Sequence, residues 1–497
     1  MKITKLFMAI FLLATLPAQA NESRICASQL QPEIEKIARS PKLQSARLGV
    51  FGQTSEPKPQ ILVNLDGDRY FIPSSNTKLF TTAIALKTLG ADYRFATRLM
   101  SKSSPNAKGE IENGLWVFGS GDPSFNSITG LKSLVTQLKE KGVKRISGGL
   151  WGLTSRKGAE ISGSWEWQDL QEDYAAIASP FTINENALNW TISPTKIDNS
   201  TIFKWEHPQE ASDWSVENNS ITTTAKSVSS KNKLPENNLK VFRPYGQKVL
   251  IISGQISENS IPELGSVAIP NPKANFLHLL RQELTIQGIE ISSTMDISRR
   301  LPPNQAPDQA LAIAYSPPLS ELITTTNKDS NNLYAELLLR ALGDRFHEIT
   351  PDDNVRGGMI AVNKYLQSVN IATTDVSLAD GSGLSRRNLA TPRAIAQLLQ
   401  TVASDRSINY DFRKSLAIAG VDGTLTNRFK NTSAQGLIQA KTGTLTGAIA
   451  LSGYANPKKY SEVIFSIMIN NSNMSAKETQ QYVDAIAILF TRLESCS

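Results

Sequence analysis

The sequence predicts an α/β (α+β) fold in which both ends of the chain build one domain, with helices around an antiparallel sheet, and the middle forms a mostly β insertion. Three observations predict it: strands followed by a helix near the N-terminus, paired strands followed by a helix near the C-terminus, and a polar, strand-rich middle. With 497 residues, 40% of them apolar, the chain is too long for one ordinary domain and can form two or three cores.

The first 20 residues predict a secretory signal peptide. Lys2 and Lys5 precede an apolar run over 6–16, and the small residues of 18–20 provide a cleavage site. The run is too short for a permanent transmembrane span, although a signal that stays attached is the alternative. Removing 20 residues from 497 leaves 477. We therefore expect an exported protein of the periplasm or another extracytoplasmic cell-wall space.

Charge argues against several classes of function. The 52 Lys and Arg residues include Lys2 and Lys5, so 50 remain after cleavage, against 45 Asp and Glu, and no dense basic run occurs. We therefore expect no nucleic-acid binding. The weak excess is compatible with peripheral contact at an anionic wall or membrane surface. Because His207, His278 and His347 are scattered and only two cysteines occur, we expect neither a metal nor another cofactor.

The two cysteines, Cys26 and Cys496, lie near the two ends of the mature chain. An oxidising compartment permits a disulfide between them, provided that both ends belong to one folded unit. Two unpaired thiols in loose tails are the alternative.

The N-terminal elements are two strands and a helix. Strands are predicted at 48–51 and 61–64, with a turn at Asp66-Gly67 and a further short strand at 70–71 that Pro73 ends. Apolar spacing then predicts a helix over 74–89, closed by Gly90. The C-terminal elements mirror this arrangement, with strands at 448–454 and 463–469 and a helix over 476–493.

The middle of the chain has a different texture. Strand-like pieces at 114–118 and 248–252 are separated by polar stretches such as 227–238, and the Pro-rich segment 301–307 resembles a linker. Helices are then predicted over 319–326, 332–342, 357–366 and 392–401. We interpret the middle as a β insertion that splits the domain made from both ends.

The first motif with chemical potential is Ser75-Asn76-Thr77-Lys78, at the start of the predicted helix. A helix places residues three apart on one face, so Lys78 can reach the Ser75 hydroxyl. An amine can take the serine proton if burial and a nearby cation lower its pKa, and the helix N-terminus can stabilise an oxyanion. The motif alone is weak evidence, because it occurs again at 230–233. That copy lies in a polar loop, and we therefore discard it.

Two later motifs complete an ordered set. In Ser330-Asn331-Asn332, Ser330 can relay a proton to a leaving amine and Asn332 can hold a substrate backbone, although such a triplet is more often a helix cap. The segment 441–444, Lys-Thr-Gly-Thr, opens an edge strand. There Lys441 would attract a terminal carboxylate and lower the pKa of Lys78, and Gly443 would admit a substrate strand. Together the three motifs are the signature of penicillin-binding proteins and serine β-lactamases.

The residues around these motifs resemble the low-molecular-mass class C penicillin-binding proteins, the D-Ala-D-Ala carboxypeptidase/endopeptidase family. The resemblance covers nearly the whole mature chain and is carried by Pro-Ser-Ser-Asn-Thr-Lys-Leu at 73–79, Gly-Asp-Pro at 121–123, Asp-Gly-Ser-Gly-Leu-Ser-Arg at 380–386, Gly-Val-Asp-Gly-Thr-Leu at 420–425 and Ala-Lys-Thr-Gly-Thr-Leu-Thr-Gly at 440–447. One departure is Asn331, a position where Asp is also common.

The resemblance implies a penicillin-binding-protein/β-lactamase-like transpeptidase domain with a second domain inserted between the first two motifs and a third within the second. The 255 residues that separate Ser75 from Ser330 match this layout. We expect the catalytic domain at 21–98 and 305–497, inserted domain II at 99–185 and 265–304, and inserted domain III at 186–264.

The resemblance also implies the roles of single residues. Ser75 would be acylated with Lys78 as base, and Ser330, Asn332 and Lys441 would complete the catalytic network. The backbone N–H groups of Ser75 and Thr444 would form the oxyanion hole. Substrate binding would involve Thr442, Gly443 and Thr444.

A pocket for the free end of the peptide side chain is the second expectation from the family. It would contain Asp169, which can bind an ammonium, Arg386, which can bind a carboxylate, and Tyr174. This pair of charges suits diaminopimelate. A surface carboxylate at Asp169 and a core aromatic at Tyr174 are the alternatives.

The resemblance implies a serine-type D-Ala-D-Ala carboxypeptidase/endopeptidase that acts on peptidoglycan stem peptides and cross-links and is inhibited covalently by β-lactam antibiotics. A serine β-lactamase or esterase of the same fold is one alternative, and a non-catalytic peptidoglycan-binding module is another. Class A β-lactamases carry Glu-x-x-Leu-Asn after the second motif, whereas 185–189, which fits this string, precedes it here. The string is therefore interpreted as a coincidence, and slow release of penicilloyl adducts is expected.

Overall fold

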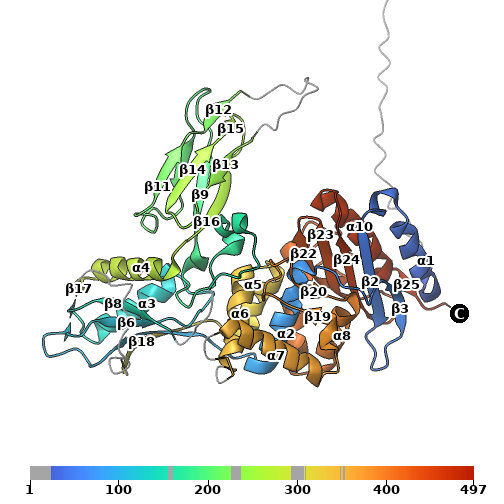
Figure 1. Ribbon diagram of the computed structural model, residues 1–497, viewed down its shortest axis with the longest axis horizontal. Helices are drawn as coiled ribbons and strands as arrows, with labels where there is room; N and C mark the ends of the chain where they lie inside the picture. The colour runs from blue at the N-terminus through green and yellow to red at the C-terminus, as the bar shows by residue number, and fades with distance from the viewer. Residues whose placement is uncertain are drawn as a thin grey trace, which may run out of the picture.

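A computed structural model describes residues 24–154, 160–224, 237–292, 307, 309–346, 349–350 and 353–496. The predicted signal peptide and the second Ser-x-x-Lys copy at 230–233 lie outside the described residues, as does most of the predicted linker at 301–307. Figure 1 shows a domain that contains both the N-terminal and the C-terminal elements, joined to a second body from which a third, all-β unit projects.

The domain that contains both the N-terminal and the C-terminal elements carries the three predicted motifs, and we call it the catalytic body. Its sheet joins strands from both ends of the chain. Among the described residues it has six strands, and every neighbouring pair is antiparallel. In spatial order the strands are β21 (Ala417–Ile418), β22 (Ile438–Leu445), β23 (Ala448–Ala455), β24 (Val463–Asn470), β2 (Arg47–Thr54) and β3 (Ile61–Leu65). The pairing of β2 with β24 makes one domain of the two termini, as the sequence predicts.

Helices cover both faces of this sheet, because its strands are apolar on both faces. Ile449 and Leu451 of β23 pack toward α1 (Ala27–Ala38) and α10 (Ala476–Thr491), whereas Ala450 points to the other face. That other face is covered by a group of helices, visible in Figure 1. They are α2 (Thr77–Leu89), α5 (Leu319–Lys328), α6 (Asn332–Asp344), α7 (Asn354–Ser368), α8 (Pro392–Ser404) and α9 (Asn409–Ser415).

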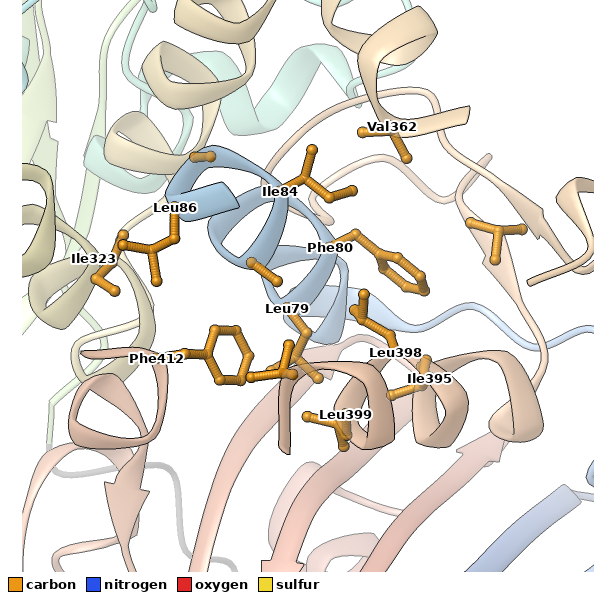
Figure 2. Packing of buried hydrophobic residues seen from close by; sticks show 14 of the residues in the cluster. Leu79, Phe80, Ile84, Leu86, Ile323, Val362, Ile395, Leu398, Leu399 and Phe412 are labelled. Carbon is orange, nitrogen blue, oxygen red and sulfur yellow. The ribbon is translucent and has the colours of Figure 1, made fainter. Parts of the chain in front are cut away.

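Helix α2 is the centre of the helical layer. Its residues from Thr77 to Leu86 are all buried, and the polar side chains of Lys78, Thr81 and Thr82 make hydrogen bonds there. Figure 2 shows Leu79 and Phe80 of α2 surrounded by side chains of neighbouring helices. These neighbours include Ile323 of α5, Val362 of α7, Ile395, Leu398 and Leu399 of α8, and Phe412 of α9. Close packing on all sides fixes the position of α2 and therefore of the side chains in its first turn.

The second body has its own core, which includes Leu99, Val117 and Leu280. Among the described residues, helices α3 (Lys132–Glu140) and α4 (Pro272–Ile286) accompany two small sheets. One has the order β18 (Gln309–Tyr315), β4 (Ala96–Ser101), β6 (Leu115–Phe118) and β8 (Leu150–Leu153). The other has the order β17 (Glu290–Ile291), β7 (Arg145–Ile146) and β5 (Glu110–Ile111).

The third unit is built from short strands around Trp190, Ile192 and Leu250. Its described sheets are β10 (Ile202–Trp205), β9 (Ala187–Ser193) and β16 (Glu263–Ala268); β11 (Ser215–Asn218), β14 (Val249–Ser253) and β13 (Lys240–Phe242); and the pair β12 (Ile221–Thr223) and β15 (Gln255–Ser257). A separate core and separate sheets agree with a largely β insertion within the second body.

The structure differs from the predicted domain boundaries at two places. Strand β18 was expected in the catalytic domain, because the insertion was expected to end at 304, yet it pairs with β4 and contributes Leu311 to the core of the second body. The end of the insertion therefore moves to about Ser316, whose hydroxyl accepts a hydrogen bond from Phe95 N. Strand β16 likewise continues past 264 in the third unit. The remaining boundaries stay predictions.

Local differences from the sequence prediction are small. The expected strand at 70–71 is a single bridge between Phe71 and Ala390, beside the short pair β19 (Val376–Ser377) and β20 (Leu389–Ala390). The expected helix over 74–89 begins with a 3₁₀ turn over Ser74–Asn76. Helices α1, α3, α4 and α9 were not predicted.

The first and the last described segments of the chain lie side by side. Strand β1 (Ile25–Cys26) pairs in parallel with β25 (Leu493–Glu494), and Cys26 forms a disulfide with Cys496 across a Cα–Cα distance of 5.6 Å. The helix predicted to reach 493 ends at Thr491, and β25 follows it. No helix in the described ranges is long and apolar enough to span a bilayer.

Candidate active site

The candidate nucleophile, Ser75, lies in the 3₁₀ turn before α2. Ser74 takes a left-handed conformation with φ of 50°, and the turn rests on β22 and β23. The Asn76 amide donates to Ser452 Oγ over 2.8 Å, which attaches the turn to β23. The Ser75 side chain is thus presented at the surface of a rigid assembly while its neighbours are buried.

Lys78 is fully buried and surrounded by oxygen atoms. Its Nζ lies 3.0 Å from Ser75 Oγ, 2.5 Å from Asn332 Oδ1 and 2.6 Å from the Ser382 carbonyl oxygen. Burial lowers the pKa of Lys78 from 10.5 to about 7, and the negative charges of Asp380 and Glu336 oppose this lowering. A large part of the Lys78 population is therefore neutral near pH 7 and can accept a proton.

The second motif lies in the break between α5 and α6, as predicted. Ser330 has a left-handed φ of 61°, and its hydroxyl accepts a hydrogen bond from Lys441 Nζ over 2.8 Å. The Asn331 side chain caps α6 by accepting from Tyr334 N, so the structure combines the cap and the site that the sequence left as alternatives. Asn332 faces Lys78 through its carbonyl oxygen and donates its amide to the Tyr174 carbonyl over 2.7 Å.

The third motif is on β22. Lys441 is fully buried, and the Thr442 hydroxyl donates a hydrogen bond to Thr424 Oγ1 over 2.9 Å. A Cβ atom at Gly443 would lie 2.7 Å from the Pro73 carbonyl, so glycine allows the strand to approach the turn before Ser75. Thr444 is exposed and lines the same cleft as Ser75.

The pKa of Lys441 is lowered by Lys78, whereas we expected Lys441 to lower the pKa of Lys78. The pKa of Lys441 is lowered well below 10.5, first by burial and then by Lys78, while Asp329 opposes the lowering. For Lys78 the main cause is burial. The prediction that burial lowers the Lys78 pKa is therefore confirmed, whereas the Lys441 charge is not among the causes of that lowering.

A buried acceptor network below the motifs was not predicted as part of the site. The Glu336 carboxylate accepts hydrogen bonds from Gly381 N over 2.9 Å and from Ser382 N over 2.8 Å, which orients the Ser382 carbonyl toward Lys78. Asp380 accepts from Gly383 N, Ser385 N and Trp165 Nε1. Burial and Asp380 raise the pKa of Glu336 to about 7. The sequence feature that could have indicated Glu336 is a single carboxylate within an apolar helical stretch.

Ser75 opens into a cleft of about 560 Å³ between the catalytic body and the inserted region. Ser330, Asn332 and Thr444 line it together with Asp169, Tyr174 and Arg386. The structure thus brings the three expected pocket residues to the catalytic motifs. Each charged group has a partner: the Tyr174 hydroxyl donates to Asp169 over 3.0 Å, and Arg386 pairs with Glu166 over 3.0 Å and donates to the Thr446 carbonyl. The exposed Tyr174 is not a core aromatic.

Metal ligation has no support in the described part of the chain, where no group of three or more His, Cys, Asp and Glu side chains could hold an ion. The expectation that no cofactor is used stays a prediction.

Comparisons with known proteins agree with the geometry. The chain is 30% identical to a D-alanyl-D-alanine carboxypeptidase of Actinomadura sp. (strain R39), over 98% of this chain and 89% of the relative. It is 31% identical to a penicillin-sensitive carboxypeptidase A of Dictyostelium discoideum, over 85% and 82% of the two chains. The crystal structure of penicillin binding protein 4 (dacB) from Haemophilus influenzae superposes with a TM-score of 0.77 at 25% identity, over 92% of this chain and 97% of that one.

The family model for D-Ala-D-Ala carboxypeptidase 3 (S13) matches residues 30–493, which includes all three motifs and both inserted units. This match confirms the resemblance found in the sequence and the predicted fold class. The protein is a serine peptidase of the penicillin-binding-protein fold, and it belongs to the D-Ala-D-Ala carboxypeptidase 3 (S13) family.

Proposed function

We propose that Ser75 forms an acyl-enzyme with peptidoglycan stem peptides, that Lys78 is its base, and that the enzyme removes terminal D-alanine and also cuts D-alanyl cross-links. The strongest support is the surroundings of Lys78. A neutral amine has two N–H donors and one lone pair. Asn332 Oδ1 and the Ser382 carbonyl can accept the two donors, which leaves the lone pair for the Ser75 hydroxyl at 3.0 Å.

In acylation, the Ser75 hydroxyl proton is transferred, and the C–N bond of the substrate is replaced by an ester bond to Ser75 Oγ. Lys78 takes the hydroxyl proton as Ser75 Oγ attacks the carbonyl of the penultimate D-alanine, and the oxyanion accepts hydrogen bonds from the N–H groups of Ser75 and Thr444. The C–N bond breaks, and the proton held by Lys78 passes to the leaving nitrogen through the Ser330 hydroxyl, which is linked to Lys441, so that Lys78 is neutral again. Water attacks the ester in the second half-reaction, again with Lys78 as base, and restores Ser75.

Substrate binding uses the rest of the cleft. Thr442, beside Lys441 and Thr424, binds the carboxylate of the terminal D-alanine, and Gly443 permits close approach of the peptide backbone. The free end of a diamino acid, an ammonium and a carboxylate, exchanges with the present partners of Asp169 and Arg386. The predicted signal peptide would bring this activity to the periplasm, where peptidoglycan peptides are accessible.

Penicillins resemble the acyl donor and should leave a long-lived adduct on Ser75. The carboxylates that line the described cleft, Glu166 and Asp169, are occupied by Arg386 and by the Tyr174 hydroxyl. Neither is free to activate a deacylating water, which favours the peptidase over the β-lactamase alternative. The penicillin sensitivity named for the Dictyostelium relative supports the same proposal.

The test is intact-mass spectrometry of the protein after exposure to benzylpenicillin, with Ser75→Ala as control. We expect one penicilloyl group on the wild type and none on the variant, together with D-alanine release from a stem pentapeptide by the wild type only. Unchanged penicillin and no adduct on either protein would favour a binding module. Rapid consumption of penicillin without a lasting adduct would favour a β-lactamase.

A further inference from the structure

A strained turn of the inserted region lies against the second motif. Asn184, Glu185 and Asn186 have consecutive left-handed φ angles of 48°, 53° and 53°. In L-residues this conformation brings Cβ close to the following carbonyl oxygen; asparagine tolerates it, whereas glutamate rarely adopts it. Glutamate therefore stands at the centre of this turn against the backbone preference, which points to a contact that its side chain makes.

The two asparagines fix the turn from both sides. Asn184 accepts from Ser127 N over 2.9 Å and donates to Glu210 over 2.7 Å. Asn186, fully buried, donates to the Ile177 carbonyl over 2.8 Å. Their amides attach the backbone to the inserted region, and the Glu185 side chain between them is directed at the catalytic body.

Glu185 reaches the middle residue of the second motif. Its Oε2 accepts a hydrogen bond from Asn331 Nδ2 over 2.7 Å, and the other end of that amide caps α6. Tyr174, also from the inserted region, accepts the Asn332 amide through its carbonyl. Two successive motif residues are therefore attached to the insertion, while the motif itself contacts the two buried lysines.

We propose that Glu185 is a positioning residue: its bond to Asn331 holds the segment 330–332 in the geometry that the buried lysines Lys78 and Lys441 require. This inference rests on the proposed function. The segment needs outside support because Ser330 is itself left-handed, at φ of 61°. A shorter residue at 185 would suit the turn better but could not span the distance to Asn331. Within the described residues Glu185 has no ion pair that would explain its retention.

The arrangement also suits an amide rather than a carboxylate at Asn331. An Asp side chain would still cap α6. It would, however, place a second carboxylate against Glu185, whose pKa is already raised, first by burial and then by the charges of Asp173 and Asp329. The donor amide of Asn331 is the partner that a carboxylate at 185 needs.

The experiment measures two quantities, the rate of acylation by a fluorescent penicillin and the Tm of thermal unfolding. It compares them among four proteins: wild type, Glu185→Gly, Glu185→Gln and Asp198→Gly. Asp198 is the matched control, because it is exposed and left-handed at φ of 64° in the third unit, and its side chain makes no hydrogen bond or ion pair with the second motif. Glu185→Gly should lower the second-order acylation rate by about tenfold or more while its Tm stays or rises. Glu185→Gln, which keeps an acceptor, should stay within about twofold of wild type, as should Asp198→Gly.

A charge exchange supplies the second measurement. Asn331→Asp should slow acylation, and adding Glu185→Gln should restore it, because the glutamine amide can donate to the new carboxylate. The inference is overturned if Glu185→Gly acylates at the wild-type rate, if its acylation and Tm fall together, or if the double variant is no better than Asn331→Asp alone. A wild-type protein with no adduct at Ser75 instead contradicts the proposed function itself.

Discussion

Changing the pH titrates the amine that is proposed as the base for Ser75. Burial lowers the pKa of Lys78 to about 7, and only the neutral amine can accept the hydroxyl proton. Since the neutral fraction grows as the pH rises through the pKa, the acylation rate should increase up to about pH 7 and level off above it. A solvent-exposed lysine would give a rate that rises throughout the accessible range.

The size of the effect follows from the pKa. At pH 7 about half of the Lys78 amines are neutral, against about one in 3,000 for a lysine with a pKa of 10.5. Below the midpoint the rate should fall tenfold per pH unit, to about 1% of its plateau near pH 5. Glu336 raises the pKa of Lys78 through its charge, so Glu336→Gln should move the midpoint to lower pH. The variant keeps an acceptor for the Gly381 and Ser382 N–H groups.

The assay is single-turnover labelling by a fluorescent penicillin, followed as a second-order rate constant from about pH 5 to about pH 10, a range that extends to both sides of the expected midpoint. Ser75→Ala provides the unlabelled baseline. Because the pKa of Glu336 is itself raised to about 7, the Gln variant also removes an overlapping ionisation from the profile. A wild-type rate that still rises tenfold per unit above pH 9, or a Glu336→Gln midpoint at higher pH, would refute the assignment of Lys78 as a buried neutral base.

Three further predictions concern the cleft and the termini. Gly383→Ala should slow penicillin labelling by about 100-fold, because φ is +86° and the added methyl would lie 1.9 Å from the Ser74 carbonyl oxygen, which displaces the turn before the nucleophile. Arg386→Ala should raise KM about tenfold for stem peptides with a free side-chain carboxylate and leave KM for peptides without it unchanged, as steady-state kinetics would show. Replacing both Cys26 and Cys496 by Ala should lower the free energy of unfolding by about 2–4 kcal/mol in urea titrations without changing the labelling rate.

The parts of the fold that depend on local sequence could be predicted. Strands β2, β23 and β24 and helices α2 and α10 have clear apolar spacing and turn residues, and their predicted bounds agree with the structure to within a few residues. The assignment of β18 to the catalytic domain was wrong, because pairing with β4 joins residues about 200 positions apart and leaves no local pattern. Helix α1 was missed because it carries an internal proline at Pro32.

The same distinction applies to the site. Ser75 and Lys78 are three residues apart in one helix, so their contact could be predicted from spacing. The contact between Glu185 and Asn331 could not, because 146 residues separate them. We interpreted the string that contains Glu185 as a coincidence because it precedes the second motif in the chain. The order of two segments in the chain does not, however, limit how close they lie in the fold. Ser382 acts through its backbone carbonyl, which every residue possesses, so its identity gave no signal.

The strand order of the catalytic sheet has a consequence for the timing of activity during synthesis. Ser75 is made early, but its turn rests on β22 and β23, and β2 needs β24 as neighbour, which pairs Arg47 with Asn470. Contacts of such long range form slowly, because a large loop must close first. A ribosome must therefore translate nearly the whole chain before the turn that carries Ser75, the proposed nucleophile, is supported. Chains that end before β22 should therefore not be labelled by penicillin.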